Sequence, residues 1–283
     1  KIYCNSPWTS IFLNPDGNVR SCCAGNWNYG NINDAPIEEI LANPKVAEVK
    51  QQILNGEIPF YCKACADAER DTGHSQRSYF QQFELENTDP TTYDLQSLDI
   101  RWSNLCNLAC LYCNEEYSSE WQKIKSIPNT STKNSNHESL LNYINNNKKK
   151  ISSIILAGGE PLYAKMVWDF IEKIPHPENV TLQFQTNFSL LEYKDKSIFE
   201  FTKNFKQVVY SISLDGLFEV GEFQRTNFKT DVFLANLNRL NEEIKTNSNI
   251  SYDFTYTTSC TNGLGTITIT SITGGTGTGG SSL

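Results

Sequence analysis

The stretch Cys106–Cys113, CNLACLYC, spaces three cysteines as C-x3-C-x2-C directly after an apolar strand candidate, Leu98–Trp102. Three thiolates on one short loop can ligate three corners of a cubane [4Fe–4S] cluster. The fourth iron then keeps an open position, which a metal site needs in order to bind a substrate or a cofactor. The spacing therefore predicts an open iron–sulfur site. Buried structural cysteines, or a zinc site completed by a fourth ligand elsewhere, are the alternatives.

Strand candidates alternate with helical periodicities on both sides of this loop. The strand candidates are Leu98–Trp102, Ile151–Ala157, Val180–Thr186, Val208–Ser213 and Ile250–Thr257. The helical stretches carry Leu140, Leu141 and Ile144, then Val167, Phe170, Ile171 and Ile174, then Phe233, Leu237, Leu240 and Ile244. Repeated β-then-α units predict a parallel sheet covered by helices. The site of such a sheet lies at the carboxyl ends of its strands.

Composition narrows the class of protein. The 283 residues include 24 basic and 32 acidic side chains, a formal net charge of −8, and 39% are hydrophobic. This acidic balance argues against a nucleic-acid or anionic-membrane binder, and no apolar run approaches the ~18 residues of a transmembrane helix. Nine cysteines, an odd number with short spacings, indicate metal chemistry in a reducing compartment, which predicts the cytoplasm.

A small Cys-rich unit precedes the repeating units. Ser10–Leu13 and Val19–Cys23 flank the turn sequence NPDGN, which predicts a hairpin, and Pro44 opens a helix that ends before Cys62-Lys63-Ala64-Cys65. We therefore expect a Cys-rich domain over residues 1–80, a linker over 81–94, an α/β core over 95–257 and a Gly/Thr/Ser-rich tail over 258–283.

The cysteine loop resembles the cluster-binding motif of the radical S-adenosylmethionine (radical SAM) superfamily. Ala157–Leu162, AGGEPL, closes the second strand as the GGEP motif of that family does, and Ser211–Gly216 ends the fourth strand like its ribose-contacting motif. The order of these motifs on successive strands carries the resemblance. It implies a partial (β/α)6 barrel with Cys106, Cys110 and Cys113 as cluster ligands. Thr266–Ile272 is the candidate for the sixth strand.

The same resemblance implies a set of SAM-binding residues. Gly158 and Gly159 would bring their backbone close to the methionine amino group, Arg225 would pair with the SAM carboxylate, and Tyr112 would lie beside the adenine. Phe188 stands where the family often has Gly after Asn187. The full expected set is Tyr112, Gly158, Gly159, Glu160, Asn187, Ser211, Ser213, Asp215 and Arg225.

The N-terminal unit resembles the auxiliary-cluster modules called SPASM and twitch. The resemblance implies a second [4Fe–4S] cluster, without an open iron, held by Cys4, Cys22, Cys62 and Cys65. Cys23 is then spare, although it could exchange roles with Cys22, and a zinc ribbon is the alternative. In well-known members the module follows the radical SAM core, whereas here it precedes it.

The implied function is reductive cleavage of SAM to a 5′-deoxyadenosyl radical that abstracts hydrogen from a substrate. A reduced ferredoxin or flavodoxin would supply the electron, and no catalytic acid or base is assigned. A peptide or protein is the expected substrate by analogy alone, and a small molecule or carbohydrate stays open. The rival predictions are a non-catalytic iron–sulfur or zinc protein of electron transfer or assembly, and an α/β enzyme with structural zinc.

Overall fold

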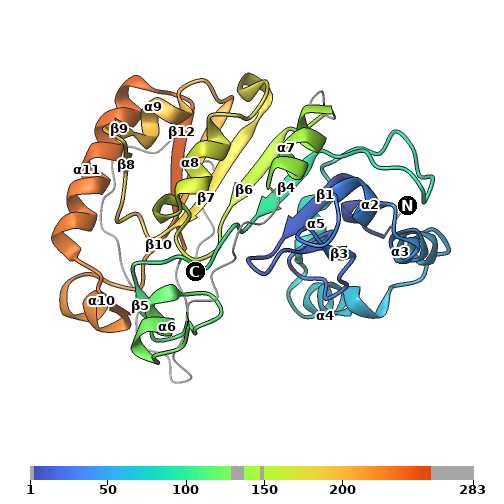
Figure 1. Cartoon of the computed structure of the whole chain (residues 1–283), viewed down its shortest axis with the longest axis horizontal. Helices are drawn as coiled ribbons and strands as arrows, with labels where there is room; N and C mark the ends of the chain where they lie inside the picture. The colour runs from blue at the N-terminus through green and yellow to red at the C-terminus, as the bar shows by residue number, and fades with distance from the viewer. Residues whose placement is uncertain (1–2, 129–136, 147–149, 256–283) are drawn as a thin grey trace.

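One sheet runs through the part of the chain that the computed structural model describes, residues 3–128, 137–146 and 150–255 (Figure 1). Its eight strands follow the order β12-β10-β7-β6-β4-β1-β2-β3. Their bounds are β1 Ser10–Leu13, β2 Asn18–Arg20, β3 Gly30–Asn31, β4 Ser97–Ile100, β6 Ser153–Leu156, β7 Thr181–Thr186, β10 Gln207–Ser213 and β12 Ile250–Thr255. Two short pairs stand apart, β5 Ala109–Cys110 with β11 Arg225–Thr226 and β8 Glu192–Tyr193 with β9 Lys196–Ser197.

Five strands, β4, β6, β7, β10 and β12, are parallel and neighbour one another in chain order. Each falls on one of the predicted apolar runs, so the expected partial radical SAM barrel is confirmed. The candidate for its sixth strand, residues 266–272, lies outside the described residues, as does the predicted tail. The elements between the five strands are α6 Ser119–Ile124, α7 His137–Asn146, η2 Pro161–Tyr163, α8 Lys165–Ile171, η3 Pro177–Asn179, α9 Ile198–Thr202, α10 Phe218–Gln224 and α11 Thr230–Thr246.

The two faces of this sheet differ in polarity. Leu98, Ile154, Leu182 and Val208 stand in one row across four strands, and each is fully buried in the core. Because side chains alternate along a strand, the neighbouring positions point to the other face. That face carries polar groups such as Gln183 and Ser211, which form a hydrogen bond of 2.9 Å. A polar face inside a barrel suits a polar ligand.

The N-terminal unit extends the same sheet. Strand β1 pairs in parallel with β4 and antiparallel with β2, so the predicted hairpin forms beside the core (Figure 1). The turn of the hairpin needs Gly17, whose φ of +87° is the left-handed conformation that glycine adopts freely. The helices of the unit are α1 Ser6–Thr9, α2 Ile37–Leu41, α3 Pro44–Leu54, η1 Phe60–Cys62, α4 Lys63–Thr72 and α5 Gln76–Phe80. None of the helices in the described part of the chain combines the length and apolarity that crossing a bilayer demands.

The segment expected as a linker is anchored to the N-terminal unit. The Asp94 amide donates to the Trp8 carbonyl at 2.9 Å, and the Trp8 indole donates to the Asp89 carbonyl at 3.1 Å. Lys50 is fully buried beneath this segment, where its ammonium donates to the Thr92 carbonyl at 2.6 Å and lies 3.6 Å from the centre of the Tyr93 ring. Burial lowers the pKa of Lys50 to about 8, against the raising effect of Asp89.

Replacing Lys50 by Met tests this buried charge. The unfolded chain holds the lysine proton up to a pKa of 10.5, whereas the folded chain releases it near 8, so wild-type stability gains with rising pH between these values. The stability of Lys50→Met relative to wild type should therefore drop by about 3 kcal/mol from pH ~7 to pH ~10. Urea unfolding at both pH values measures this, with the exposed Lys45→Met on the same helix as control. Parallel curves for Lys50→Met and wild type would contradict it.

Candidate functional site

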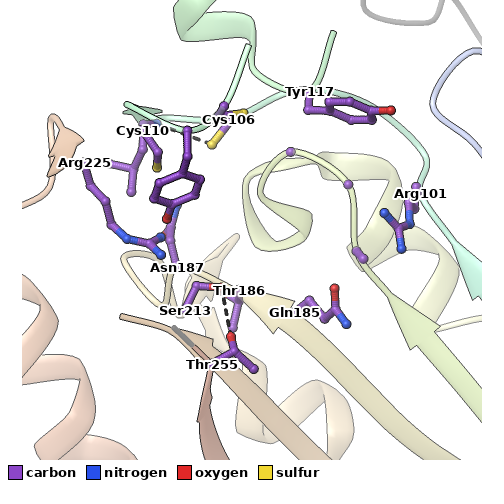
Figure 2. A pocket seen from close by; sticks show the side chains of 16 residues that line it. Arg101, Cys106, Cys110, Tyr117, Gln185, Thr186, Asn187, Ser213, Arg225 and Thr255 are labelled. Carbon is purple, nitrogen blue, oxygen red and sulfur yellow. Dashed lines mark hydrogen bonds between the residues drawn. The ribbon is translucent and has the colours of Figure 1, made fainter. Parts of the chain in front are cut away.

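A cavity of about 230 Å³ lies at the carboxyl ends of the parallel strands (Figure 2). All five parallel strands contribute to its wall through their ends or the residues after them, which are Arg101 after β4, Gly158 after β6, Thr186 on β7, Ser213 on β10 and Thr255 on β12. The three cysteines of the C-x3-C-x2-C loop, Cys106, Cys110 and Cys113, line the same cavity. The structure thus brings together the predicted cluster loop and the predicted SAM-binding motifs.

Backbone pairing attaches the cysteine loop, residues 106–113, to the segment that follows β10. Cys110 in β5 is the register partner of Arg225 in β11, and the Leu111 amide donates to the Gln224 carbonyl at 2.9 Å. On its other side the loop is held by the Trp121 indole, which donates to the Cys110 carbonyl at 2.9 Å. The middle cysteine therefore has a fixed backbone on both sides.

Two serines at the start of α6 hold the rest of the loop. The Ser119 hydroxyl accepts a hydrogen bond from the Cys106 amide and donates to the Cys106 carbonyl, each at 3.1 Å. The Ser118 hydroxyl donates to the Leu108 carbonyl at 2.7 Å. Because both serines are buried, these bonds satisfy backbone groups that water does not reach, and they fix the loop geometry.

The donor set fits a [4Fe–4S] cluster. Burial raises the pKa of all three thiols, to about 12 for Cys106, so metal binding would release their protons. The charge of Arg225 acts in the opposite direction on Cys110 and Cys113. The Leu108 amide already donates to the Cys106 sulfur at 3.4 Å, a type of contact that tunes cluster sulfurs.

The glycines of the GGEP sequence serve the loop as well as the cavity. A Cβ atom at Gly159 would lie 2.3 Å from the Leu105 carbonyl oxygen, and Gly158 has a φ of +121°. The Gly159 amide donates to the Ser103 carbonyl at 3.0 Å. Both glycines line the cavity, but their first role is to let this turn dock on the backbone that leads into the cluster loop.

Glu160 lies behind the cavity wall. It is 1% exposed, and its carboxylate accepts hydrogen bonds from the Thr186 hydroxyl at 2.7 Å and the Asn187 amide at 2.6 Å. Burial raises its pKa to about 7, and these hydrogen bonds act against the rise. Thr186 and Asn187 do line the cavity, so Glu160 positions the end of β7 instead of facing the cavity itself.

Phe188 keeps the backbone conformation that the family's glycine would adopt. Its φ is +58°, in the left-handed region, and its ring is fully buried against Tyr210. The Asn187 side chain next to it donates to Asn107 in the cluster loop at 2.9 Å. Packing of the Phe188 ring therefore supports a turn that would otherwise favour glycine.

Asp215 holds two other predicted SAM-binding residues. Its Oδ2 accepts a hydrogen bond from Arg225 Nε at 2.7 Å and from the Tyr112 hydroxyl at 2.6 Å. The side chains of Asp215 and Arg225 are 2% and 5% exposed, and of the three residues only Arg225 and Tyr112 are part of the cavity lining. The resemblance implies a ribose contact for Asp215, which stays a prediction, and the structure shows that Asp215 also fixes Arg225 and Tyr112.

Asp215→Ala should lower both stability and SAM affinity. It leaves the buried Arg225 charge without its carboxylate, and breaking such a pair costs about 3–5 kcal/mol. SAM binding weakens because Arg225 and Tyr112 lose their fixed positions. Urea unfolding and equilibrium SAM binding on one preparation measure the two effects, with the exposed Asp253→Ala as control. Unfolding indistinguishable from that control would show that the pair does not hold the site.

The two serines of β10 in the predicted set lie at different depths. Ser213 lines the cavity, with its hydroxyl 3.4 Å from that of Thr255. Ser211 is 2% exposed and accepts a hydrogen bond from the Gln183 side chain at 2.9 Å, so it lies deeper in the barrel. Seven lining residues are outside the set that the sequence analysis selected, namely Arg101, Leu108, Tyr117, Ala157, Gln185, Thr186 and Thr255. For Arg101, Ala157, Gln185, Thr186 and Thr255 a position at or just after a strand end was the available signal, whereas Tyr117 lies in the segment before α6 and gave no such signal.

A second, smaller cavity of about 20 Å³ lies in the N-terminal unit. All four predicted auxiliary ligands, Cys4, Cys22, Cys62 and Cys65, line it. Cys23 is not among the described residues that line it. The charges of Asp99 and Arg101 influence the pKa of Cys23, although burial is the larger cause of its rise to about 11. Cys22 therefore fits the ligand position better than Cys23. Four thiols that line one cavity are the donor set of a closed iron–sulfur cluster, whereas among the described residues no group of His, Cys, Asp and Glu side chains is placed to hold a single metal ion.

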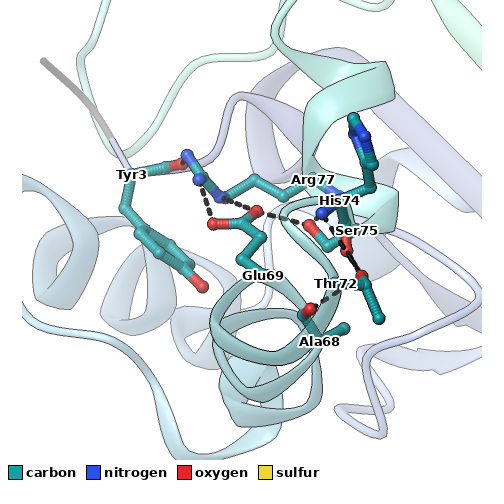
Figure 3. A network of polar contacts seen from close by, with 7 residues as sticks. All are labelled: Tyr3, Ala68, Glu69, Thr72, His74, Ser75 and Arg77. Carbon is teal, nitrogen blue, oxygen red and sulfur yellow. Dashed lines mark hydrogen bonds and ion pairs between the residues drawn. The ribbon is translucent and has the colours of Figure 1, made fainter.

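Arg77, Glu69 and Ser75 form a polar network, here called the polar clamp, that holds the N-terminal segment at Tyr3 (Figure 3). Tyr3 and Arg77 also line the second cavity. The Arg77 guanidinium pairs with Glu69 through Nε at 2.7 Å and again through Nη2, and its Nη1 donates to the Tyr3 carbonyl at 2.9 Å. Glu69 also accepts from the Ser75 hydroxyl. Since Tyr3 precedes Cys4, the clamp holds the first ligand beside those on η1 and α4.

Arg77→Gln should release Cys4 and empty the auxiliary site. The expected result is a loss of about half of the iron after anaerobic reconstitution, roughly four of eight atoms per chain. Iron and sulfide analysis measures the loss. Arg70→Gln, an exposed arginine on α4 that pairs only with surface aspartates, should keep the full amount. Full iron content in Arg77→Gln would mean that Cys4 needs no clamp.

Comparison with known proteins agrees with this geometry. Residues 100–258 match the radical SAM superfamily, and residues 4–66 match SPASM, an iron–sulfur cluster-binding domain. The first match covers more than half of the chain, so the chain belongs to the radical SAM superfamily. Membership implies a [4Fe–4S] cluster and SAM as cofactors, and the SPASM match implies further iron–sulfur binding, so the predicted family and cofactors are confirmed. The assignment of individual residues stays a prediction.

One solved structure is similar in part. "Native anSMEcpe with bound AdoMet" shares 23% sequence identity at a TM-score of 0.39, over 56% of this chain and 43% of that one. The chain thus spans less than half the length of that protein. No curated protein matches the chain.

Proposed function

We propose that this protein cleaves SAM reductively and uses the resulting radical to modify a peptide or protein. The observation that carries the proposal is the shared cavity, where three cysteines with cluster spacing meet residues from successive strand ends. The rival reading, a plain electron-transfer protein, has no need for such a cavity beside the cluster loop. Membership in a superfamily of SAM-dependent enzymes supports the same choice.

The bound cofactors would supply the radical chemistry. Held by Cys106, Cys110 and Cys113, a cluster with an open iron would supply the electron for cleavage of the SAM carbon–sulfur bond to methionine and a 5′-deoxyadenosyl radical. The protein's own part is to bind and orient. Cys106, Cys110 and Cys113 hold the cluster, Arg225 offers the SAM carboxylate a fixed charge, and Ser213 offers hydroxyl contacts. Burial of Cys106 and Cys110 keeps water from two of the three ligand positions.

The substrate class and the electron donor are inferred from the two family matches. The SPASM match supports a peptide or protein substrate by analogy, and the superfamily generally takes electrons from reduced ferredoxin or flavodoxin. Exposed apolar side chains near the cavity mouth, among them Leu111 and Phe223, are compatible with a chain that lies across it.

Anaerobic reconstitution followed by incubation with SAM and dithionite tests the proposal. We expect about eight irons per chain and formation of 5′-deoxyadenosine. Replacing Cys106, Cys110 and Cys113 together by Ala should abolish deoxyadenosine formation and leave about four irons in the N-terminal site. Cys23→Ala is the matched control and should change neither readout. Undiminished deoxyadenosine in the triple variant, or stoichiometric zinc without absorption near ~400 nm, would refute the proposal.

A further inference from the structure

The cavity contains a second arginine that the SAM-binding motifs leave unused. Arg101 follows β4 and lines the cavity together with Tyr117 and Gln185 (Figure 2). It lies on the side away from Arg225, as Figure 2 shows. Of the described residues that line the cavity, two are arginines and none is Asp or Glu. The lining therefore has donors and positive charge but no carboxylate of its own.

Arg101 is held at the junction of the two units. Its amide donates to the Leu13 carbonyl at 2.9 Å, which attaches it to β1 of the N-terminal unit. Its guanidinium lies 4.9 Å from the centre of the Phe12 ring, a cation–π contact. The position of this guanidinium thus depends on the pairing of β1 with β4.

The existing partner of Arg101 leaves part of the guanidinium available. Nε and Nη2 contact the two Asp99 oxygens at 3.3 and 3.4 Å, longer than a normal charge-assisted hydrogen bond. Nη1 has no hydrogen-bond partner among the described residues. The side chains of Arg101 and Asp99 are 25% and 14% exposed, whereas those of Arg225 and Asp215 are almost fully buried. Asp215 therefore fixes Arg225 in place, whereas the more exposed Arg101 has donors left for a second ligand.

The surroundings of Arg101 add to its positive character. Arg20 of β2 carries a buried Nε without a hydrogen-bond partner in the described part of the chain. Burial raises the pKa of the Tyr117 hydroxyl, and the charge and hydrogen bond of Glu116 raise it further. Arg101 and Arg20 both act against the rise, so both of their charges reach this hydroxyl as well. Gln185, on the open face of β7, supplies a neutral donor on the same side of the cavity.

We propose that the substrate presents a carboxylate to Arg101, with Tyr117 and Gln185 beside it. A carboxylate accepts two parallel hydrogen bonds from the outer edge of a guanidinium, which the long Asp99 contacts leave open. The inference rests on the proposed function, because it takes the remainder of the cavity to hold SAM. The carboxylate can belong to an acidic side chain of a peptide or to a small dicarboxylate, and the probes below separate these two sources.

The test measures binding to the reconstituted protein with SAM present. The probes are the peptide acetyl-Ala-Glu-Ala-amide, its neutral counterpart with Gln in place of Glu, and glutarate, each followed by ligand-observed NMR. We expect the Glu peptide to bind at least about 10-fold more tightly than the Gln peptide. Glutarate weaker than the Glu peptide identifies a peptide source, and glutarate of equal affinity identifies a small dicarboxylate. Equal affinity of the Glu and Gln peptides overturns the proposal.

Variants assign the preference to Arg101. Arg101→Gln should remove the preference for Glu over Gln, and the exposed Arg239→Gln should keep it. Asp99→Asn, which removes the competing carboxylate, should bind the Glu peptide at least as tightly as wild type. Iron content, melting temperature and SAM affinity of Arg101→Gln should match those of Arg239→Gln. A retained Glu preference in Arg101→Gln, or a 10-fold loss of its SAM affinity, would overturn the proposal, the latter because Arg101 would then serve SAM.

The outcome separates this inference from the proposed function. SAM cleavage by the wild type without any Glu preference would reject the carboxylate site alone. A Glu preference that depends on Arg101, in a protein that forms no deoxyadenosine, would reject the proposed function and keep the anion site.

Discussion

The site depends on one buried ion pair, Arg225 with Asp215. The same carboxylate also accepts the Tyr112 hydroxyl. Arg225 in turn is the backbone partner of Cys110. One carboxylate at the end of β10 therefore fixes a side chain and a backbone segment of the cluster loop. A buried ion pair contributes a defined position more than it contributes stability, and a cluster ligand needs a defined position.

The rest of the loop is attached by a different means, near the ends of β4 and β6, the first two parallel strands of the core. Ser118, Ser119 and the turn at Gly159 use neutral hydrogen bonds and close backbone contact instead of charge. Neutral polar contacts thus fix the loop on the side of β6, and the ion pair of Arg225 with Asp215 fixes it on the side of β10. Residues of both attachments, Gly159 and Arg225, line the cavity.

Local patterns predicted most of the fold. Strand period, helical period and turn residues gave the hairpin at residues 10–20, the helix after Pro44 and the five parallel strands, all within a few residues. The pairing of β1 with β4 left no such signal, because a ladder between distant segments depends on which edges meet and not on either sequence. Motif spacing selected cysteines that the structure places around two cavities. It could not show that Glu160 and Asp215 stand behind the cavity, since a motif gives a residue type and not the direction of its side chain.

The shared sheet joins the two units through backbone pairing, and it also brings side chains of the N-terminal unit into contact with a residue of the cavity wall. Phe12 of the N-terminal hairpin is the register partner of both Asp99 in β4 and Arg20 in β2, so these side chains stand on one face in one row. Arg101 belongs to the same face because it follows Asp99 by two residues. The cavity therefore has one wall whose charges are set by the N-terminal unit and an opposite wall set by Arg225 and Asp215. A change in the hairpin at Phe12 or Arg20 would alter the environment of Arg101 while the cluster loop kept all of its contacts. Under the proposed carboxylate site, substrate preference and SAM binding are then separable properties of one cavity, each with its own arginine and its own supporting carboxylate.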